Sequence, residues 1–369
     1  ATTKPVPHPT HPSSAAAAEP GSPSFRRKEM MMGRYDSMAG MDDGPTRGFL
    51  TTAEVWNKIV AAGTAKAKYS WHKKVLLSFL AGCYLSFGML FAFIVGGQLG
   101  PIKAAEPGIF NIIFGFFGLP FGLTIIILMG ADLFTSDVMF MIASFVEGKC
   151  TIVAVAWNLV WCWFGNLCGS LWMTQLCVWG EVFKGKAALD VIVSVSIAKT
   201  TTGFGVLVVR GILCNWLVCI AVWQALTAQD VTGKFVGVLI PVTIFVASGF
   251  EHCIANQFAI PMGLRLGSGI SASEIAAHNL IPVTIGNFIS AMLFMVGFYW
   301  VCIGSGHGRL VNSWNNACDR LVPHPLLNKW IRTEEKAVPK EAMSCDPSIQ
   351  CHSAETSKRC QKVALQPVA

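Results

Sequence analysis

The stretch Val246 to Phe258, VASGFEHCIANQF, decides how the chain folds. It lies inside a segment, Phe235 to Leu264, that is otherwise apolar and long enough to cross a membrane as a helix. Glu251 and His252 stand within it, and ionisable groups in hydrocarbon normally face a protein interior or a water-filled path. Small polar residues beside them indicate an interrupted helix, which is tolerated at membrane depth only where its free backbone groups are buried in protein or line a cavity. We therefore expect His252 to lie in the middle of a transport path.

The composition is that of a polytopic membrane protein. Of 369 residues, 53% are hydrophobic and 13% are charged, and the mean hydropathy is +0.52. Soluble domains carry about 25% charged residues. The deficit is concentrated between Val75 and Ile303, and the net charge of +7 lies largely in the segments that flank this block. Basic flanks fit contact with membrane lipid, and no basic face with interleaved aromatics indicates nucleic acid as a partner.

The apolar pattern predicts six membrane segments, which together make residues 75–304 one six-span domain. They are Val75–Gly97, Ile109–Ile142, Thr151–Val178, Thr200–Trp223, Phe235–Leu264 and Leu280–Ile303. An even number places both termini on one side, and the basic residues outside the first and last segments mark that side as cytoplasmic or its topological equivalent. Lys184, Lys186 and Lys199 then fall in a loop on the opposite side.

Three segments that flank the six-span domain differ from it in composition. Residues 1–48 are rich in Pro, Ala and Ser and are expected to be disordered; their composition resembles an organellar transit peptide or its remnant, and a plain cytosolic tail is equally compatible. Residues 49–74 are expected to contain an amphipathic helix lying along the membrane surface. Residues 305–369 are expected to be a disordered tail, either inert or used for regulation, partner binding or palmitoylation of its cysteines.

The two halves of the six-span domain echo each other. GADLFTS interrupts the second expected segment as GFEHCIAN interrupts the fifth. A G-N pair follows each acid, with Asn166 thirty-four residues after Asp132 and Asn287 thirty-six residues after Glu251. Three spans per half is an odd number, so the halves must have opposite orientations, and matching broken helices then point to a substrate site near the midplane. The predicted fold is all-α, with six spans as a 3+3 inverted repeat and with the second and fifth helices broken.

No cofactor and no metal site are expected. The thirteen cysteines include no CxxC pair, so neither a disulfide framework nor a zinc site is predicted. His252 alone lies deep in an expected span, too few for a metal site built on histidines.

Several motifs carry a resemblance to a known family. GADLFTS, WFGN, ILCNWLVCIAVW, VASGFEHCIANQF, IPMG and NLIPVTIGN follow one another at its spacing, and from about Thr52 to Ile303 the chain resembles the formate/nitrite transporter family. The resemblance implies a homopentamer with one aquaporin-like pore in each protomer. It implies passage of small monovalent anions or their conjugate acids, such as formate, nitrite, hydrosulfide, lactate and, in an algal plastid branch, bicarbonate. It also implies a channel or transporter rather than an enzyme.

The flanking segments suit a eukaryotic member of that family. The transit-like N-terminal composition and the long C-terminal tail favour the algal nitrite/bicarbonate branch. The chloroplast envelope is then the expected membrane, with the plasma membrane as the alternative.

The resemblance assigns four residues to the substrate path. His252 matches the family's central histidine, which can donate a hydrogen bond or a proton because its reference pKa is about 6.5; a core histidine paired with a hydroxyl is the alternative. Thr135 matches the threonine that hydrogen-bonds this histidine, or it caps a half-helix beginning near Ser136. Lys199 and Asn215 match the vestibule lysine and the asparagine that faces it. A cation at a pore mouth concentrates anions, whereas an ordinary interfacial lysine would snorkel to the headgroups.

Apolar constrictions are expected on both sides of His252. Counted from the family motifs, Leu119 and Phe245 lie on the vestibule side, and Leu123 and Leu133 lie on the N-terminal side. Hydrophobic constrictions gate by excluding hydrated ions. Ordinary core or lipid-facing positions are the alternative for each of these residues.

Polar residues at the two breaks are expected to support the structure. Asp132 and Glu251 are expected to satisfy backbone N–H groups freed at the breaks, with proton coupling as the alternative. Asn256, Asn166 and Asn287 are assigned the same supporting role.

The expected function is passage of a small monovalent anion, either nitrite, formate or bicarbonate, with His252 donating a hydrogen bond or a proton between two hydrophobic constrictions. The alternative is an aquaporin-like pore for neutral solutes, which a six-span inverted repeat fits equally well. The charged Lys199, the central His252 and the absence of an Asn-Pro-Ala pair argue against it. A membrane-embedded metalloenzyme is a third class, and elemental analysis showing bound zinc or iron would support it.

Overall fold

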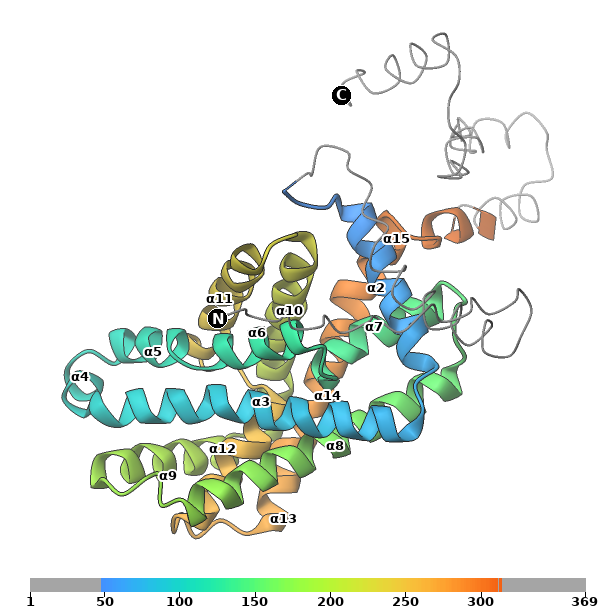
Figure 1. Cartoon of the computed structure of the whole chain (residues 1–369). Coiled ribbons are helices and arrows are strands. Elements are labelled where there is room, and N and C mark those ends of the chain that lie inside the picture. Colours follow the sequence, from blue (N-terminus) through green and yellow to red (C-terminus); the bar gives the residue numbers. More distant parts are fainter. Residues whose placement is uncertain (1–47, 311, 314–369) are drawn as a thin grey trace, which may run out of the picture.

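The computed structural model describes residues 48–310, 312 and 313 (Figure 1). The expectations for residues 1–47 and 314–369, including disorder and a use for the C-terminal cysteines, lie outside the described residues. Within the described part, helices dominate, and one isolated antiparallel bridge joins Phe49 to Ala228.

The helices follow one another with short connections. Their bounds are α2 Thr52–Ala67, α3 Trp71–Gln98, α4 Gly100–Ala105, α5 Pro107–Phe116, α6 Leu119–Met129, α7 Phe134–Val146, α8 Ile152–Trp179, α9 Lys186–Thr201, α10 Phe204–Thr227, α11 Val231–Ala247, α12 Cys253–Arg265 and α13 Ala272–Ile275. A π-helical stretch η1 Ala276–Leu280, α14 Ile281–Ser290, a second π-helical stretch η2 Ala291–Gly297 and α15 Phe298–Cys302 continue from α13.

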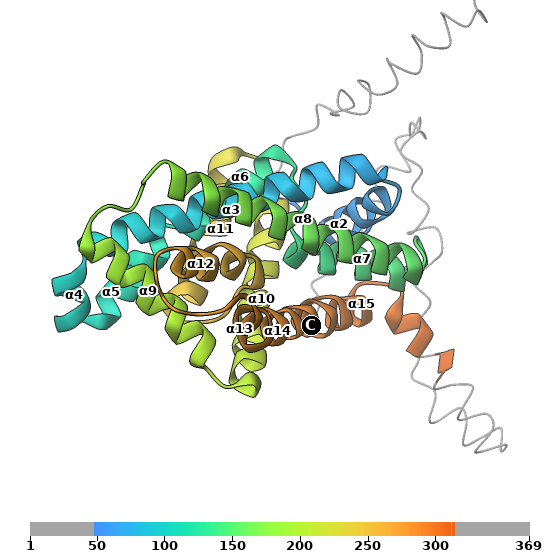
Figure 2. The same cartoon turned by 90° about the horizontal axis from the view of Figure 1, so that it is seen from below.

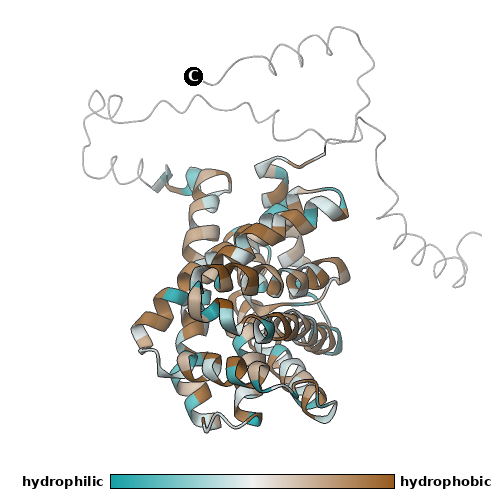
Figure 3. Cartoon of the chain, turned by 90° about the vertical axis from the view of Figure 1, so that its left-hand side faces the viewer, coloured by the Kyte–Doolittle hydropathy of each residue, from teal (hydrophilic) through white to brown (hydrophobic). Residues whose placement is uncertain are grey.

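Five helical stretches in the described part are long and apolar enough to cross a membrane. They are Trp71–Gln98, Pro107–Met129, Ile152–Trp179, Phe204–Thr227 and Ala272–Cys302. The helices α7 and α11 are apolar but shorter. Much of the helical ribbon has the colour of hydrophobic residues in Figure 3. Many large hydrophobic side chains are exposed, among them Trp157, Phe164 and Trp172 of α8. An outer surface of this kind suits contact with the hydrocarbon tails of membrane lipids.

Side-chain caps explain where several helices begin. Thr51 and Glu54 form a capping box at the start of α2, in which each side chain bonds the other's backbone N–H. Thr151 accepts a hydrogen bond from Ala154 at the start of α8, and Asp230 accepts one from Gly233 at the start of α11.

Glycine lets two helix pairs, α3 with α8 and α10 with α14, approach closely. In Figure 1, α3 runs across the molecule, and α4 turns the chain back so that α5 and α6 lie along α3. The helix α8 packs on α3, and α14 packs on α10. A Cβ on Gly82 of α3 would lie 2.1 Å from the Asn166 carbonyl oxygen of α8. A Cβ on Gly286 of α14 would lie 2.2 Å from the Val208 carbonyl oxygen of α10. Small residues let membrane helices pack backbone to backbone in this way.

Two non-helical segments interrupt the apolar runs where the sequence predicted breaks. Gly130 ends α6 with φ of +66°, and Gly249 follows α11 with φ of +69°. Glycine adopts this left-handed conformation without the strain that other residues meet. The chain then enters α7 and α12.

Several boundaries differ from the predictions. The expected second segment comprises three helices, because the chain also leaves helical geometry at Phe117 and Gly118, just before Pro120 in the first turn of α6. Pro120 has no N–H with which to continue a helix from α5. The first and last long helices begin at Trp71 and Ala272, earlier than expected.

Three segments expected to be a loop, a surface helix on lipid or a disordered tail are helical, and the first two pack on other helices. The predicted loop with Lys186 and Lys199 is the helix α9, which lies beside α12 as Figure 2 shows. The apolar face of α2 packs on α7 rather than on lipid, and Gly63 permits this because a Cβ there would lie 2.0 Å from the Phe140 carbonyl oxygen. Residues 306–310, at the start of the expected tail, are also helical.

Candidate functional site

His252 and Thr135 meet at the centre of the molecule, each from one break. Thr135 Oγ1 lies 3.0 Å from His252 Nε2, and His252 is 4% exposed. The backbone N–H of Ala255 donates to His252 Nδ1 at 3.1 Å, so the imidazole caps α12. Because Nδ1 accepts a hydrogen bond, the ring proton of the neutral histidine is assigned to Nε2, which faces Thr135.

Asn166 organises the first break. Its Oδ1 accepts a hydrogen bond from the Phe134 N–H at 2.9 Å, and its Nδ2 donates to the Asp132 carbonyl at 2.9 Å and to the Ser78 carbonyl at 2.7 Å. The Asp132 N–H donates to the Leu77 carbonyl at 3.2 Å. One buried amide thus bonds backbone groups that the missing helical turn leaves free.

Asn287 does the same at the second break. Its Oδ1 accepts from the Cys253 N–H at 2.9 Å, and its Nδ2 donates to the Glu251 carbonyl at 3.0 Å and to the Gly211 carbonyl at 2.8 Å. The Glu251 N–H donates to the Arg210 carbonyl at 3.3 Å. The two breaks therefore carry the same four hydrogen bonds, position by position.

The two acidic side chains differ from their expected role, because each pairs with a lysine rather than with backbone N–H groups. Asp132 forms an ion pair with Lys66 of α2. Glu251 Oε2 lies 2.7 Å from Lys199 Nζ of α9 and accepts a hydrogen bond from Asn256 Nδ2 at 2.7 Å. A buried carboxylate requires a compensating charge, whereas an amide can both donate and accept across a break.

Asn215 also differs from expectation. Instead of facing Lys199, its Nδ2 donates to the Thr135 carbonyl at 3.2 Å and to the Asn287 carbonyl at 2.7 Å. Its Oδ1 is buried without a hydrogen-bond partner among the described residues. The partner of the Lys199 carbonyl is Asn279, whose Nδ2 donates to it at 2.9 Å.

All four expected constriction residues are brought together beside His252. They line one small cavity, with about 10 Å³ of free volume, whose wall comprises Leu85, Leu119, Leu123, Leu133, Val218, Val242, Phe245 and His252. The Phe245 ring stacks on the imidazole with centroids 6.0 Å apart. A water needs about 10–15 Å³, so this space barely admits one water molecule.

A larger vestibule adjoins this constriction. Its volume is about 460 Å³, and its wall includes Leu119 and Phe245 at the inner end together with His252. Lys103, Lys199, Arg210 and Glu251 also line it. Lys199 and Glu251 neutralise each other, so the positive charge of the vestibule comes from Lys103 and Arg210.

Sequence reasoning did not identify those two cations. Lys103 Nζ lies 3.4 Å from Ser194 Oγ, and Ser194 lines the same vestibule. The Arg210 guanidinium makes no hydrogen bond or ion pair to any residue that the structure describes. Arg210 interrupts the apolar run LVVRGILC of a predicted span, and an ionisable residue there is itself a functional signal. No local pattern marks Lys103.

Lys66, Asp137 and Lys74 are a further charged group that sequence reasoning did not use. Asp137 Oδ1 lies 2.8 Å from Lys66 Nζ, so Lys66 contacts two carboxylates. Burial by itself would lower the pKa of Lys66, but the charges of Asp137 and Asp132 and their hydrogen bonds raise that pKa above its ordinary value. Lys66 therefore stays charged.

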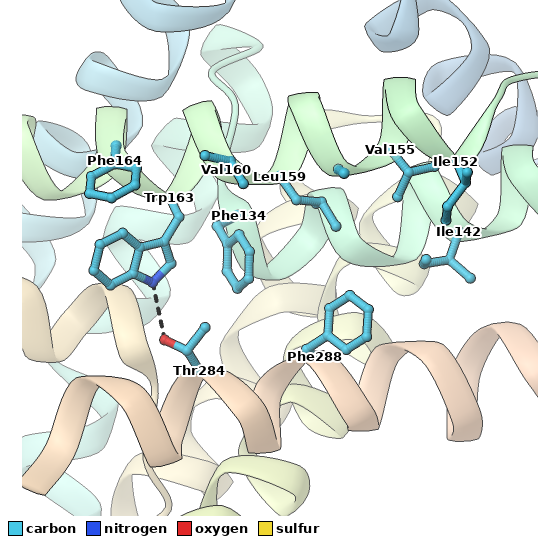
Figure 4. Close-up of a pocket in the computed structure, with 11 residues that line it drawn as sticks. Phe134, Ile142, Ile152, Val155, Leu159, Val160, Trp163, Phe164, Thr284 and Phe288 are labelled. Carbon is cyan, nitrogen blue, oxygen red and sulfur yellow. Dashed lines mark hydrogen bonds between the residues drawn. The ribbon is translucent and has the colours of Figure 1, made fainter. Parts of the chain in front are cut away.

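An apolar pocket of about 400 Å³ lies apart from this site, between α7, α8 and α14 (Figure 4). Aromatic and branched side chains line it, and Trp163 Nε1 donates to Thr284 Oγ1 across it at 3.0 Å. With its polar groups bonded to each other, this pocket suits hydrocarbon rather than an anion.

Apolar outer surfaces, non-helical breaks in two apolar runs and a buried polar pair beside a cationic vestibule are the features of a multi-pass membrane transport protein. The family model described as formate/nitrite transporter matches residues 53–301, and the chain belongs to that family. Its relatives are transporters and channels rather than enzymes.

Similar proteins include a probable formate transporter of Methanothermobacter thermautotrophicus, 35% identical over 269 residues, which cover 68% of this chain and 96% of that protein. A solved FNT family ion channel is 31% identical with a TM-score of 0.61, and the match covers 68% of this chain and 98% of that one. A solved pentameric formate channel with formate bound is 28% identical with a TM-score of 0.55, covering 63% of this chain and 97% of that one.

Proposed function

We propose that this chain conducts small monovalent anions, with formate, nitrite and bicarbonate as the candidate substrates, along a path through His252. The observation that carries this proposal is the hydrogen bond between His252 and Thr135 beside a small apolar constriction that adjoins a cationic vestibule. The cap on α12 uses only Nδ1, so Nε2 and its hydrogen bond to Thr135 remain available beside the constriction to a passing polar group.

The proposed architecture is six spans in a 3+3 inverted repeat, with α6–α7 and α11–α12 as the broken spans. The matched hydrogen bonds of Asn166 and Asn287 support it, because each asparagine ties its break to the first long helix of its own half. Two lysines support it further, since Lys66 and Lys199 each pair with the acid of one break.

The mechanism has three steps. Lys103 and Arg210 attract the anion into the vestibule, where their charge raises its local concentration. The anion loses water between Leu119 and Phe245. The His252 Nε2–H then donates to it in place of Thr135, which offsets part of the several kcal/mol that a bare charge costs at the bilayer centre.

In the proposed mechanism, His252 acts as a hydrogen-bond donor rather than as a proton donor. Its single ring proton lies on Nε2 because Nδ1 is occupied by the Ala255 N–H. Giving that proton away would leave an imidazolate, so a substrate that crosses as its conjugate acid brings its proton from the vestibule water.

A flux panel in proteoliposomes tests the proposal. Nitrite, formate, bicarbonate and hydrosulfide are supplied across a range of pH, with protein-free liposomes as the control, and at least one anion is expected to cross faster than in the control. Flux of glycerol or water without any anion flux would instead support the pore for neutral solutes.

The oligomeric state and the membrane that holds the protein are further parts of the proposal. A homopentamer is proposed because the similar formate channel is pentameric, and native mass spectrometry of the detergent-purified protein tests it. The chloroplast envelope is proposed from the composition of residues 1–48, with the plasma membrane as the alternative, and a fluorescent fusion of the full chain distinguishes the two.

A further inference from the structure

The two lysine–acid pairs beside the breaks are not equivalent. At the second break, Lys199 pairs with one carboxylate, Glu251, whose other contact is the neutral Asn256 amide. At the first break, Lys66 pairs with two carboxylates, Asp132 and Asp137.

The hydrogen-bond pattern gives the correspondence between them. Asp137 is the fourth residue of α7, five residues after Asp132, and Asn256 is the fourth residue of α12, five residues after Glu251. Asp137 therefore occupies the position that a neutral amide occupies in the other half.

The first half also has a second lysine, Lys74, without a counterpart in the second half. Lys74 precedes Ser78, whose carbonyl accepts from Asn166, by four residues on α3. The residue four before Gly211, whose carbonyl accepts from Asn287, is the apolar Leu207. The charged groups that face Asp137 are Lys66 from α2, Lys74 from α3 and Asp132 from the break, and the thiol of Cys162 from α8 faces it as well.

This cluster has acceptor atoms left over. Asp132 is 1% exposed and Asp137 is fully buried, yet Oδ2 of each has no hydrogen-bond partner within the described residues. A buried carboxylate oxygen without a donor costs free energy, and the smallest group that removes the cost is a proton. The Lys66 side chain remains 12% exposed, so the cluster has contact with the outside.

We propose that Lys66, Lys74, Asp132 and Asp137 form a proton-binding site in the N-terminal half of the path, and that Asp137 is the carboxylate that takes the proton. With both aspartates ionised, the two lysines and two aspartates sum to zero charge. A proton from water on Asp137 makes the cluster carry one positive charge, without any other bond changing. Asp132 directly precedes the constriction residue Leu133, so this charge lies at the approach to the constriction.

The bound proton makes this side of the path attractive to an anion, as the unpaired cations do in the vestibule. Acid conditions thus promote anion loading at the N-terminal half through the protein, in addition to any protonation of the substrate itself. This inference rests on the proposed function.

Two matched variants test it, measured with equal pH on both sides of the membrane. Asp137→Asn fixes the charge that protonation would give, so its flux is expected to equal the wild type in acid. It is then expected to exceed the wild type with rising pH, by no more than about tenfold per pH unit, the limit for one proton. Asn256→Asp adds the same acid opposite Lys199 and is expected to lose flux, relative to the wild type, as pH rises. Substrate protonation is common to all three proteins and cancels in these ratios.

A second readout does not depend on flux. The infrared C=O band of a buried protonated carboxylic acid is expected in the wild type and in Asn256→Asp under acid conditions, and it is expected to be lost in Asp137→Asn. The Asp137→Asn variant should fold, since an asparagine, Asn256, is accommodated at the corresponding position of α12. If Asp137→Asn nevertheless fails to assemble, the flux of Asn256→Asp is the remaining flux test.

Flux ratios that do not change with pH, or an unchanged infrared band in Asp137→Asn, would overturn the proton site while leaving anion conduction intact. A wild type that carries no anion would instead overturn the proposed function.

Discussion

In the proposed mechanism, His252 presents one hydrogen to the anion path, and Thr135 accepts it when no anion is bound. A passing anion replaces a neutral acceptor by a charged one, and hydrogen bonds to charged groups contribute about 1.5–3 kcal/mol against about 1 for neutral pairs. In the proposed mechanism, this exchange of Thr135 for an anion offsets part of the cost of dehydrating the anion.

Replacing His252 by Ala should lower anion flux by about ten- to a hundredfold, which corresponds to the loss of one charge-assisted hydrogen bond at about 1.4 kcal/mol per factor of ten. Stopped-flow anion uptake measures this. His252→Asn is the matched control, because asparagine is also a good helix cap and keeps a neutral donor, so it should retain more flux than alanine. Equal flux in His252→Ala and wild type would contradict the role.

At the scale of the elements, glycine contacts hold the long helices together. Gly82→Ala would place a methyl group 2.1 Å from a backbone oxygen of α8, and overpacking of this kind costs about 1–3 kcal/mol. We expect Gly82→Ala to lower the thermal unfolding temperature in detergent. Gly205→Ala is the control, because a Cβ there meets nothing within 4 Å, and it should unfold like the wild type. Equal unfolding temperatures for both variants would mean that α3 and α8 can separate without loss.

The breaks were predictable from sequence because acids and glycines stand out in an apolar run. The helix α9 was not, since it is stabilised by its contact with α12, where a Cβ on Gly263 would lie 2.0 Å from Ser196 Oγ. The division of the second span into α5 and α6 was likewise missed, although Pro120 marks the boundary.

The residues of the site were predictable where a motif carried them, and their partners were not. His252 and Thr135 meet as the resemblance implied. The pairings of Lys66 with Asp132 and of Lys199 with Glu251 join residues 66 and 52 positions apart, and no local pattern indicates which charges meet after folding.

At the scale of the whole molecule, the charges on the described vestibule wall do not cancel. Lys103 and Arg210 remain after Lys199 and Glu251 pair. The electrostatic field of these two cations is screened by salt over the Debye length, which is about 30 Å at 0.01 M and about 8 Å at 0.15 M ionic strength.

Arg210→Gln should therefore reduce uptake at low anion concentration several-fold in low salt, with the difference shrinking toward 0.15 M salt. Initial uptake rates at several ionic strengths measure it. Lys186→Gln removes the same charge from an exposed position on α9, where Lys186 is paired with Asp190, and it should have little effect. A loss that is independent of salt, or equal in both variants, would exclude a steering role for Arg210.

The hydrogen bond from the Ala255 N–H to His252 Nδ1 also opposes the uptake of a second proton by the imidazole. A second proton on the ring would have to occupy Nδ1, and α12 would then lose the acceptor at its first turn. A helix cap contributes about 1 kcal/mol, so a proton on Nδ1 would cost about that much at the start of α12. In the proposed mechanism, the contact that begins α12 therefore also favours release of the anion, since an uncharged donor releases an anion more readily than an imidazolium would.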